Sequence, residues 1–149
     1  MECREAIESG ISALAGIRGK DPAAKENWIR RISGYINRTH NPRYAPLPRI
    51  IYVTEDHGRI VGFIAGHLTQ RFDCEGELEW IDVLPEFRNQ GIAATLLQHL
   101  AAWFIDRKAF QIFVDCAPDN LIAQNFYKKN GAEKLNEHWL VWKDISRIV

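Results

Sequence analysis

The sequence has little of several features that mark particular protein classes. Its 149 residues include three cysteines and one methionine, and its 19 basic side chains are balanced by 19 acidic ones. The odd, widely spaced cysteines (Cys3, Cys74 and Cys116) argue against a disulfide framework and favour a reducing, cytoplasmic compartment. Because the net charge is zero, nothing attracts the whole chain to nucleic acid or to an anionic membrane, and any anion site must be local.

Long apolar runs and several common motifs are also missing. No segment approaches the roughly 20 apolar residues that span a bilayer, and residues 1–5 lack the basic start of a targeting signal. The chain has neither a Walker phosphate-binding sequence nor a dinucleotide fingerprint. Its five histidines have no zinc-ligand spacing, so we expect no metal. With 46% hydrophobic residues, the chain is expected to fold as one globular domain over residues 1–149.

Helical and strand-like patterns alternate along the chain. Helical spacing is seen in residues 7–14, 21–36, 89–104 and 120–130, and strand-like segments in 50–54, 59–68, 77–83, 110–115 and 138–143. A turn at residues 56–58 predicts a hairpin, and the crossover from Ile81 to Phe113 predicts two parallel neighbours. We therefore predict an α/β or α+β fold with a mixed sheet flanked by helices.

The stretch from Glu77 to Leu97 is predicted to be a strand, a loop and a helix. The loop brings Arg88 and Asn89 to the start of the helix, where backbone N–H groups lack partners and the helix dipole is positive. Small residues at Gly91 and Ala93 let a bulky ligand approach the backbone, which favours a pyrophosphate site. The alternative is an ordinary loop, with Asn89 as the helix N-cap and Arg88 in solvent.

Two motifs in this order resemble those of the GNAT superfamily of N-acetyltransferases. The loop and helix with Arg88, Gly91 and Ala93 resemble its acyl-CoA signature. Asn120, seven residues before Tyr127 on a helix that ends at Gly131, is similar to its second motif. The resemblance covers about residues 50–142.

This resemblance implies a GNAT-like, mostly antiparallel sheet with a splayed parallel strand pair that holds acetyl-CoA. The co-substrate would lie between the strand ending at Val83 and the strand ending at Asp115, in a single acyl-CoA N-acyltransferase domain. The implied cofactor-binding residues are Ile81, Asp82, Val83, Arg88, Asn89, Gln90, Gly91, Ile92, Ala93, Ala94 and Asn120.

The chemistry of amine acetylation requires a base and an acid. Glu79 is the first choice for the base, with Asp115 and Asp82 as alternatives, and Tyr127 can protonate the leaving thiolate because a phenol is protonated at neutral pH. Simple strand alternation would put Glu77, Glu79 and Ile81 on one face and Asp82 on the other. The competing interpretations are solvated edge carboxylates and a core tyrosine.

Several points stay open at this stage. Residues 1–14 read as helical, whereas the family begins with a strand; a missing strand would expose a sheet edge and make a homodimer possible. The acceptor is an unidentified small-molecule or peptide amine, with Tyr44, Phe72 and Trp80 as possible pocket residues, and longer acyl groups are not excluded. Lys25, Arg30, Arg31 and Arg38 form a basic helix face that we expect to be solvated, with contact to an acidic partner as the alternative. A noncatalytic acyl-CoA-binding or protein-interaction module is the alternative function.

Overall fold

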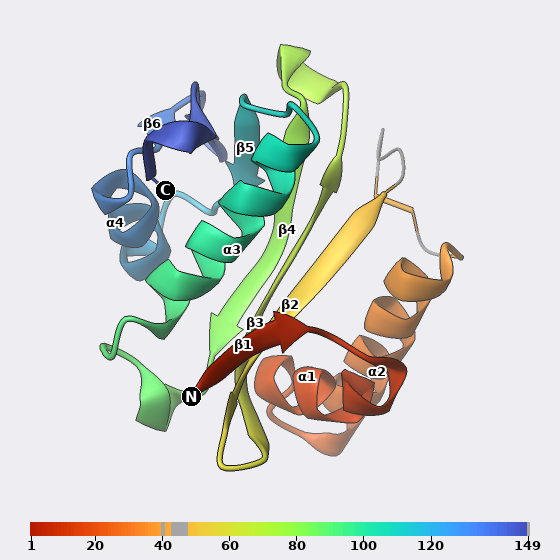
Figure 1. Ribbon diagram of the computed structural model, residues 1–149. Coiled ribbons are helices and arrows are strands. Elements are labelled where there is room, and N and C mark those ends of the chain that lie inside the picture. Colours follow the sequence, from red (N-terminus) through yellow and green to blue (C-terminus); the bar gives the residue numbers. More distant parts are fainter. Residues whose placement is uncertain (40, 43–47, 149) are drawn as a thin grey trace.

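The computed structural model describes residues 1–39, 41–42 and 48–148, which form a mixed sheet between two pairs of helices (Figure 1). The strand order is β1-β2-β3-β4-β5-β7-β6. The strands are β1 (Glu2–Glu5), β2 (Arg49–Asp56), β3 (Arg59–Leu68), β4 (Gly76–Val83), β5 (Ile112–Asp115), β6 (Glu133–Lys134) and β7 (Trp139–Trp142). The helices are α1 (Ile11–Arg18), α2 (Pro22–Asn37), α3 (Ile92–Asp106) and α4 (Leu121–Lys129).

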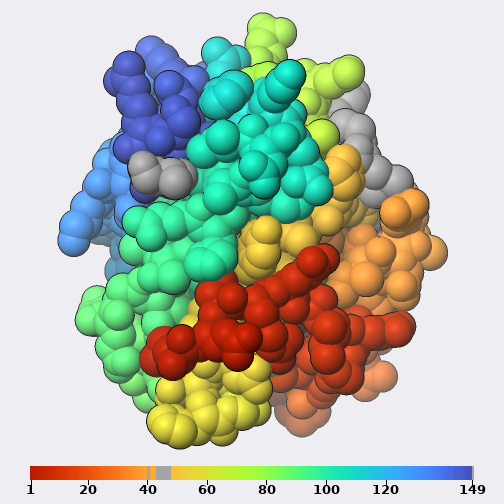
Figure 2. Space-filling model, viewed as in Figure 1, coloured from red at the N-terminus to blue at the C-terminus, as the bar shows by residue number. Residues whose placement is uncertain are grey.

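Each face of the sheet has its own core. Leu96, Leu97 and Leu100 of α3 belong to one buried cluster with Ile64 and Leu78 of the sheet. On the other face, α1 and α2 contribute a second cluster that surrounds Trp80 of β4. Figure 2 shows the face on which α3 and the N-terminal segment lie side by side above the tip of the β2–β3 hairpin. None of the described helices is both long and apolar enough to cross a membrane.

Local sequence signals account for several boundaries. The Asp21 side chain accepts a hydrogen bond from the Ala24 N–H at 2.8 Å, and Pro22 occupies the first turn of α2, as predicted. His57 and Gly58 both have positive φ angles, 49° and 80°, which suits the tight turn between β2 and β3. These signals confirm the predicted hairpin and the start of the second helix.

The parallel pair that positions the site is β4 and β5. Gly76 to Leu78 pair in parallel with Ile112 to Val114, and all other strand pairs in the described sheet are antiparallel. The pairing with β5 ends at Leu78, although β4 continues to Val83. The mixed, mostly antiparallel sheet with a splayed parallel pair is thus confirmed.

The prediction of a helix over residues 1–14 was wrong. Glu2 to Glu5 form β1, which pairs antiparallel with β2, and α1 begins only at Ile11. The apolar spacing that suggested a longer helix included Ile7, but this side chain is 59% exposed. The first strand is therefore present, and the structural reason for expecting a homodimer no longer applies.

Two other boundaries differ from the prediction. The third helix begins at Ile92 with Gly91 as its N-cap, three residues later than expected, because Asn89 and Gly91 have left-handed φ angles of 62° and 81°. The first helix continues through Gly16 to Arg18. Tyr44, a possible pocket residue, lies outside the described residues.

Candidate active site

A β-bulge in β4 determines which side chains face the two helix layers. Ala65 of β3 is opposite Trp80 and Gly66 is opposite Leu78, so Glu79 is an extra residue without a counterpart. After the bulge, Ile81 packs in the core beneath α3, whereas Asp82 faces Arg18 of α1 at 4.0 Å. The prediction from simple alternation was therefore wrong: Glu79 and Asp82 share a face, and Ile81 lies on the opposite one.

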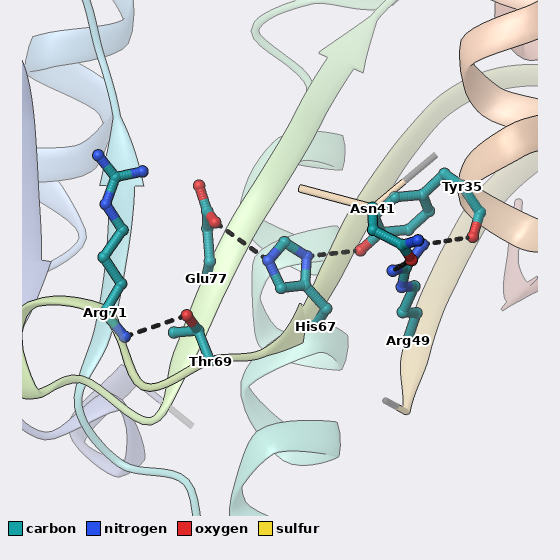
Figure 3. A network of polar contacts seen from close by, with 7 residues as sticks. All are labelled: Tyr35, Asn41, Arg49, His67, Thr69, Arg71 and Glu77. Atoms are coloured by element: carbon teal, nitrogen blue, oxygen red, sulfur yellow. Dashed lines mark hydrogen bonds and ion pairs between the residues drawn. The ribbon is translucent and has the colours of Figure 1, made fainter. Parts of the chain in front are cut away.

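Glu77 belongs to a buried hydrogen-bonded network on the α2 side of the sheet (Figure 3). Nε2 of His67 lies 3.0 Å from Glu77 Oε1, and its Nδ1 lies 2.9 Å from the Tyr35 hydroxyl. A neutral imidazole satisfies both contacts if Tyr35 donates to Nδ1 and the Nε2–H group donates to Glu77. Burial lowers the pKa of His67 to about 4, which agrees with the neutral form.

The network continues from Tyr35 to the end of α2. Arg49 of β2 donates a hydrogen bond to the Tyr35 carbonyl at 2.8 Å and another to the Asn41 side chain. Its guanidinium also stacks on the Tyr35 ring, 4.8 Å from the ring centre. Three elements, α2, β2 and β3, thus fix the histidine that contacts Glu77.

Glu79 is a half-buried carboxylate suited to accept a proton. Burial, followed by the nearby charge of Glu77, raises its pKa to about 7, while His67 and Arg31 act in the opposite direction. Its carboxylate forms no hydrogen bond or ion pair with any other described residue. Glu77 has a similarly raised pKa of about 7, again mainly through burial, but it is held by His67.

His67, Glu77 and Glu79 also have the atom types of a metal site. Their potential ligand atoms lie within 4.8 Å of one another. However, both ring nitrogens of His67 already have hydrogen-bond partners, and a metal ligand must present a free nitrogen lone pair. The arrangement fits a hydrogen-bonded network better than a metal centre.

Tyr127 lies on α4, on the other side of the gap between β4 and β5. The residue is 5% exposed, and its ring packs against Trp142 with a centroid distance of 5.8 Å. Burial raises its pKa, and the charges of Asp115 on β5 and Asp82 on β4 act in the same direction. The raised pKa means that this phenol stays protonated at neutral pH.

The loop before α3 leaves its backbone accessible. Gly91 provides no side-chain cap, and a Cβ atom at this position would meet nothing within 4 Å. The Thr95 N–H is bonded to the Gly91 carbonyl, so the N–H groups of Ile92, Ala93 and Ala94 precede the first intrahelical bond. Asn89 is not the N-cap, in contrast to the alternative considered from sequence.

Arg88 and Asn120 make contacts within the protein. Arg88 folds back over the end of β4, where its Nε donates to the Val83 carbonyl at 3.0 Å and its Nη2 lies 3.5 Å from Asp82. The Val83 N–H donates to Asp82 Oδ1 at 2.9 Å, so both main-chain groups of Val83 have partners. Asn120 is the N-cap of α4, and its Oδ1 accepts from the Ala123 N–H at 3.2 Å.

Glu79 and Asp82 lie on β4 and Asp115 lies on β5, the two strands that splay apart, and the charges of Asp82 and Asp115 act on Tyr127 of α4. Asp82 is engaged by Arg18 and Arg88, whereas the carboxylates of half-buried Glu79 and exposed Asp115 form no hydrogen bond or ion pair with any described residue. Sequence reasoning missed Arg18, whose pKa is lowered by burial despite the opposing charges of Asp82, Tyr127 and Glu79. It also missed His67, because its partners come from distant segments and no local spacing reveals them.

A family model described as "Acetyltransferase (GNAT) family" matches residues 21–132. The chain belongs to this family. Uncharacterized N-acetyltransferases of Mycobacterium bovis and Mycobacterium tuberculosis are 29% identical over 109 residues, which are 72% of this chain and 69% of each relative.

Solved GNAT structures share the fold at low sequence identity. The PaiA N-acetyltransferase of Thermoplasma acidophilum, solved in complex with coenzyme A, has a TM-score of 0.73 and 16% identity, covering 96% of this chain and 98% of that one. A ribosomal-protein-alanine N-acetyltransferase of Brucella melitensis has a TM-score of 0.67 at 20% identity, over 95% and 96% of the two chains. An aminoglycoside 6'-N-acetyltransferase of Acinetobacter haemolyticus has a TM-score of 0.73 at 17% identity, over 91% and 93%.

Proposed function

We propose that this protein transfers the acetyl group of acetyl-CoA to a primary amine by direct attack of the amine on the thioester. The observation that carries the proposal is the pairing of β4 with β5, which ends at Leu78 and leaves the following residue, Glu79, with an unengaged carboxylate. The protonated phenol of Tyr127, which the charges of Asp82 on β4 and Asp115 on β5 influence, supports it. Membership of the GNAT family supports this reaction class.

In this proposal, Glu79 acts as the general base. Alkyl amines are mostly protonated at neutral pH, since their pKa is near 10, and the acceptor must lose a proton before its nitrogen can attack. A carboxylate whose pKa is about 7 accepts that proton more readily than one of ordinary pKa. The nitrogen then forms a bond to the carbonyl carbon as the carbon–sulfur bond breaks, and it releases its second proton to solvent as the amide forms.

Tyr127 completes the proton balance as the general acid. The departing sulfur of coenzyme A takes a proton from the phenol, and solvent restores the phenol after the products leave. Asp82 and Asp115 then keep structural and electrostatic roles, since their charges help to hold Tyr127 protonated.

The residues that fit acetyl-CoA lie on both sides of the gap. Backbone amides of residues 89–94 would bind the pyrophosphate at the positive end of α3. The backbone of Ile81 and Asp82 would align the acetyl and pantetheine portion, and the Asn120 amide would donate to the pantetheine arm. The Val83 N–H is bonded to Asp82 and its carbonyl to Arg88, so Val83 can contact acetyl-CoA through the second lone pair of its carbonyl or after Asp82 moves.

The reaction is tested by incubating a panel of amines with acetyl-CoA and measuring thiol release, with mass spectrometry of the acetylated amine. The expected result is amine-dependent thiol release that is lost in the Glu79→Gln Tyr127→Phe double variant. If the protein binds coenzyme A but releases no thiol with any amine, the result would instead support the noncatalytic module.

A further inference from the structure

Two arginines stack on one tryptophan beside the proposed base. The guanidinium carbons of Arg18 on α1 and Arg31 on α2 lie 4.4 Å and 4.2 Å from the centre of the Trp28 ring. Trp28 in turn makes an edge-to-face contact with Trp80 of β4, with a centroid distance of 5.5 Å. Trp80 directly follows Glu79, so both cations lie on the sheet face that carries the base.

The two arginines differ in their ion-pair partners. Arg18 faces Asp82 at 4.0 Å, whereas Arg31 forms no ion pair or hydrogen bond with any residue that the structure describes. Stacking against an indole fixes the plane of a guanidinium and leaves its edge N–H groups for a planar anion. Arg31 is therefore positioned by Trp28, and no described carboxylate forms an ion pair with it.

Of the three β4 carboxylates on the sheet face that carries Glu79, two have partners and one does not. Glu77 is held by His67, and Asp82 is shared by Arg18 and Arg88. Glu79 is the unengaged acid, and the Arg31 charge acts on it. One free anion and one free cation on the same face match a ligand that carries both charges.

We propose that the acceptor is a zwitterionic amino-carboxylate, such as an amino acid or a peptide amine with a nearby carboxylate. This inference rests on the proposed acetyl transfer and names its substrate class. Arg31 binds the acceptor carboxylate, while the ammonium group faces Glu79 and gives it a proton. A second ammonium group at the Arg31 position would meet two guanidiniums, so diamines and other polycations are disfavoured.

The test compares amines of equal length that differ at one end. 4-Aminobutanoate, butylamine and 1,4-diaminobutane are each supplied with acetyl-CoA, and kcat/KM is measured by thiol release. We expect 4-aminobutanoate to be the best and the diamine to be the worst of the three. An aminoalkyl phosphate of similar length shows whether the site selects a carboxylate or any anion; a phosphate preferred over the carboxylate would overturn the proposed class.

Arg31→Gln should remove the preference for 4-aminobutanoate over butylamine by raising the KM for 4-aminobutanoate. We expect the KM for 4-aminobutanoate to rise about 10- to 100-fold, the range for losing a hydrogen bond to a charged group, with little change for butylamine. Arg31→Lys should restore part of the loss. Arg30→Gln is the matched control, because it removes the same charge from an exposed neighbour on α2.

Failure of the zwitterion proposal can be distinguished from failure of the proposed acetyl transfer. Turnover led by the diamine, or an Arg31→Gln variant that affects all three amines equally, overturns the zwitterion proposal and leaves acetyl transfer standing. Absence of thiol release with every amine, peptides included, rejects the proposed reaction and this inference with it.

Discussion

Nε2 of His67 lies 3.0 Å from Oε1 of Glu77, and both residues influence the neighbouring Glu79: the charge of Glu77 raises its pKa and His67 lowers it. After burial, the charge of Glu77 is the next cause that raises the pKa of Glu79. The pH dependence of the reaction therefore reports on both carboxylates.

We expect the rate to fall as the pH drops through about 7, because the base must be deprotonated and its pKa is raised to about 7. Glu79→Gln should lower kcat by about 10²- to 10⁴-fold and remove this limb. Glu77→Gln should keep activity but move the limb to lower pH, since the Glu77 charge raises the pKa of Glu79. A pH profile of kcat that is identical in wild type and Glu77→Gln would contradict the assigned coupling.

Tyr127→Phe should separate binding from chemistry. Removing one hydroxyl keeps the ring contact with Trp142, so coenzyme A binding measured by thermal shift should persist. The rate should fall by about 100-fold or more, because the thiolate loses its acid. Tyr52→Phe is the matched control on β2, and equal activity of Tyr127→Phe and Tyr52→Phe would remove Tyr127 from the mechanism.

Gly91→Glu should abolish coenzyme A binding by adding bulk and negative charge where the pyrophosphate would lie. Gly58→Glu is a close control, because both glycines have positive φ, 81° and 80°, and neither has atoms within 4 Å of an added Cβ. Each variant should lose about 1–2 kcal/mol through the same backbone strain. Isothermal titration with coenzyme A checks the prediction, and tight binding by Gly91→Glu would refute the placement.

Asn120 variants should distinguish its capping role from ligand binding. Asn120→Ala loses the bond to the Ala123 N–H and should cost about 1 kcal/mol of stability. Asn120→Asp keeps the cap but lacks the amide donor, so its Tm should match wild type while the KM for acetyl-CoA rises. A wild-type KM in Asn120→Asp would leave this residue with a capping role alone.

His67 should make folding sensitive to acid. Its pKa is about 4 in the folded protein and 6.5 in an unfolded chain, so the unfolded chain binds the proton first and stability falls as the pH drops from about 6.5 to 4. Glu77 and Glu79 act in the opposite sense between about pH 7 and 4.5, because their folded pKa values are raised. Urea unfolding of His67→Gln against wild type isolates the histidine: the stability lost by wild type on acidification should exceed that lost by the variant.

Local signals made much of the fold predictable. Asp21 and Pro22 specify the start of α2 without reference to distant residues, and the helical crossover from Ile81 to Phe113 specified the parallel pair. β1 was not predictable from its own residues, because a four-residue strand with three charged side chains is stabilised only by pairing with β2.

The candidate site was only partly predictable for a related reason. Glu79 and Tyr127 were proposed from the sequence and stay a prediction, but the partners of His67 come from α2 and β4, and only folding brings them together. Arg31 was expected to be solvated, since helical periodicity places it at the edge of the apolar face. Its stacking on Trp28 depends on the rotamers of both side chains, which no spacing rule contains.

The unmatched residue in β4 has an evolutionary corollary. Loss of the codon for residue 79 would remove the one residue of β4 that has no counterpart in β3, and with it the proposed proton acceptor. Under the proposed mechanism, this single deletion would remove catalysis and keep the fold. Relatives that lack the residue should therefore be stable proteins that do not transfer an acetyl group.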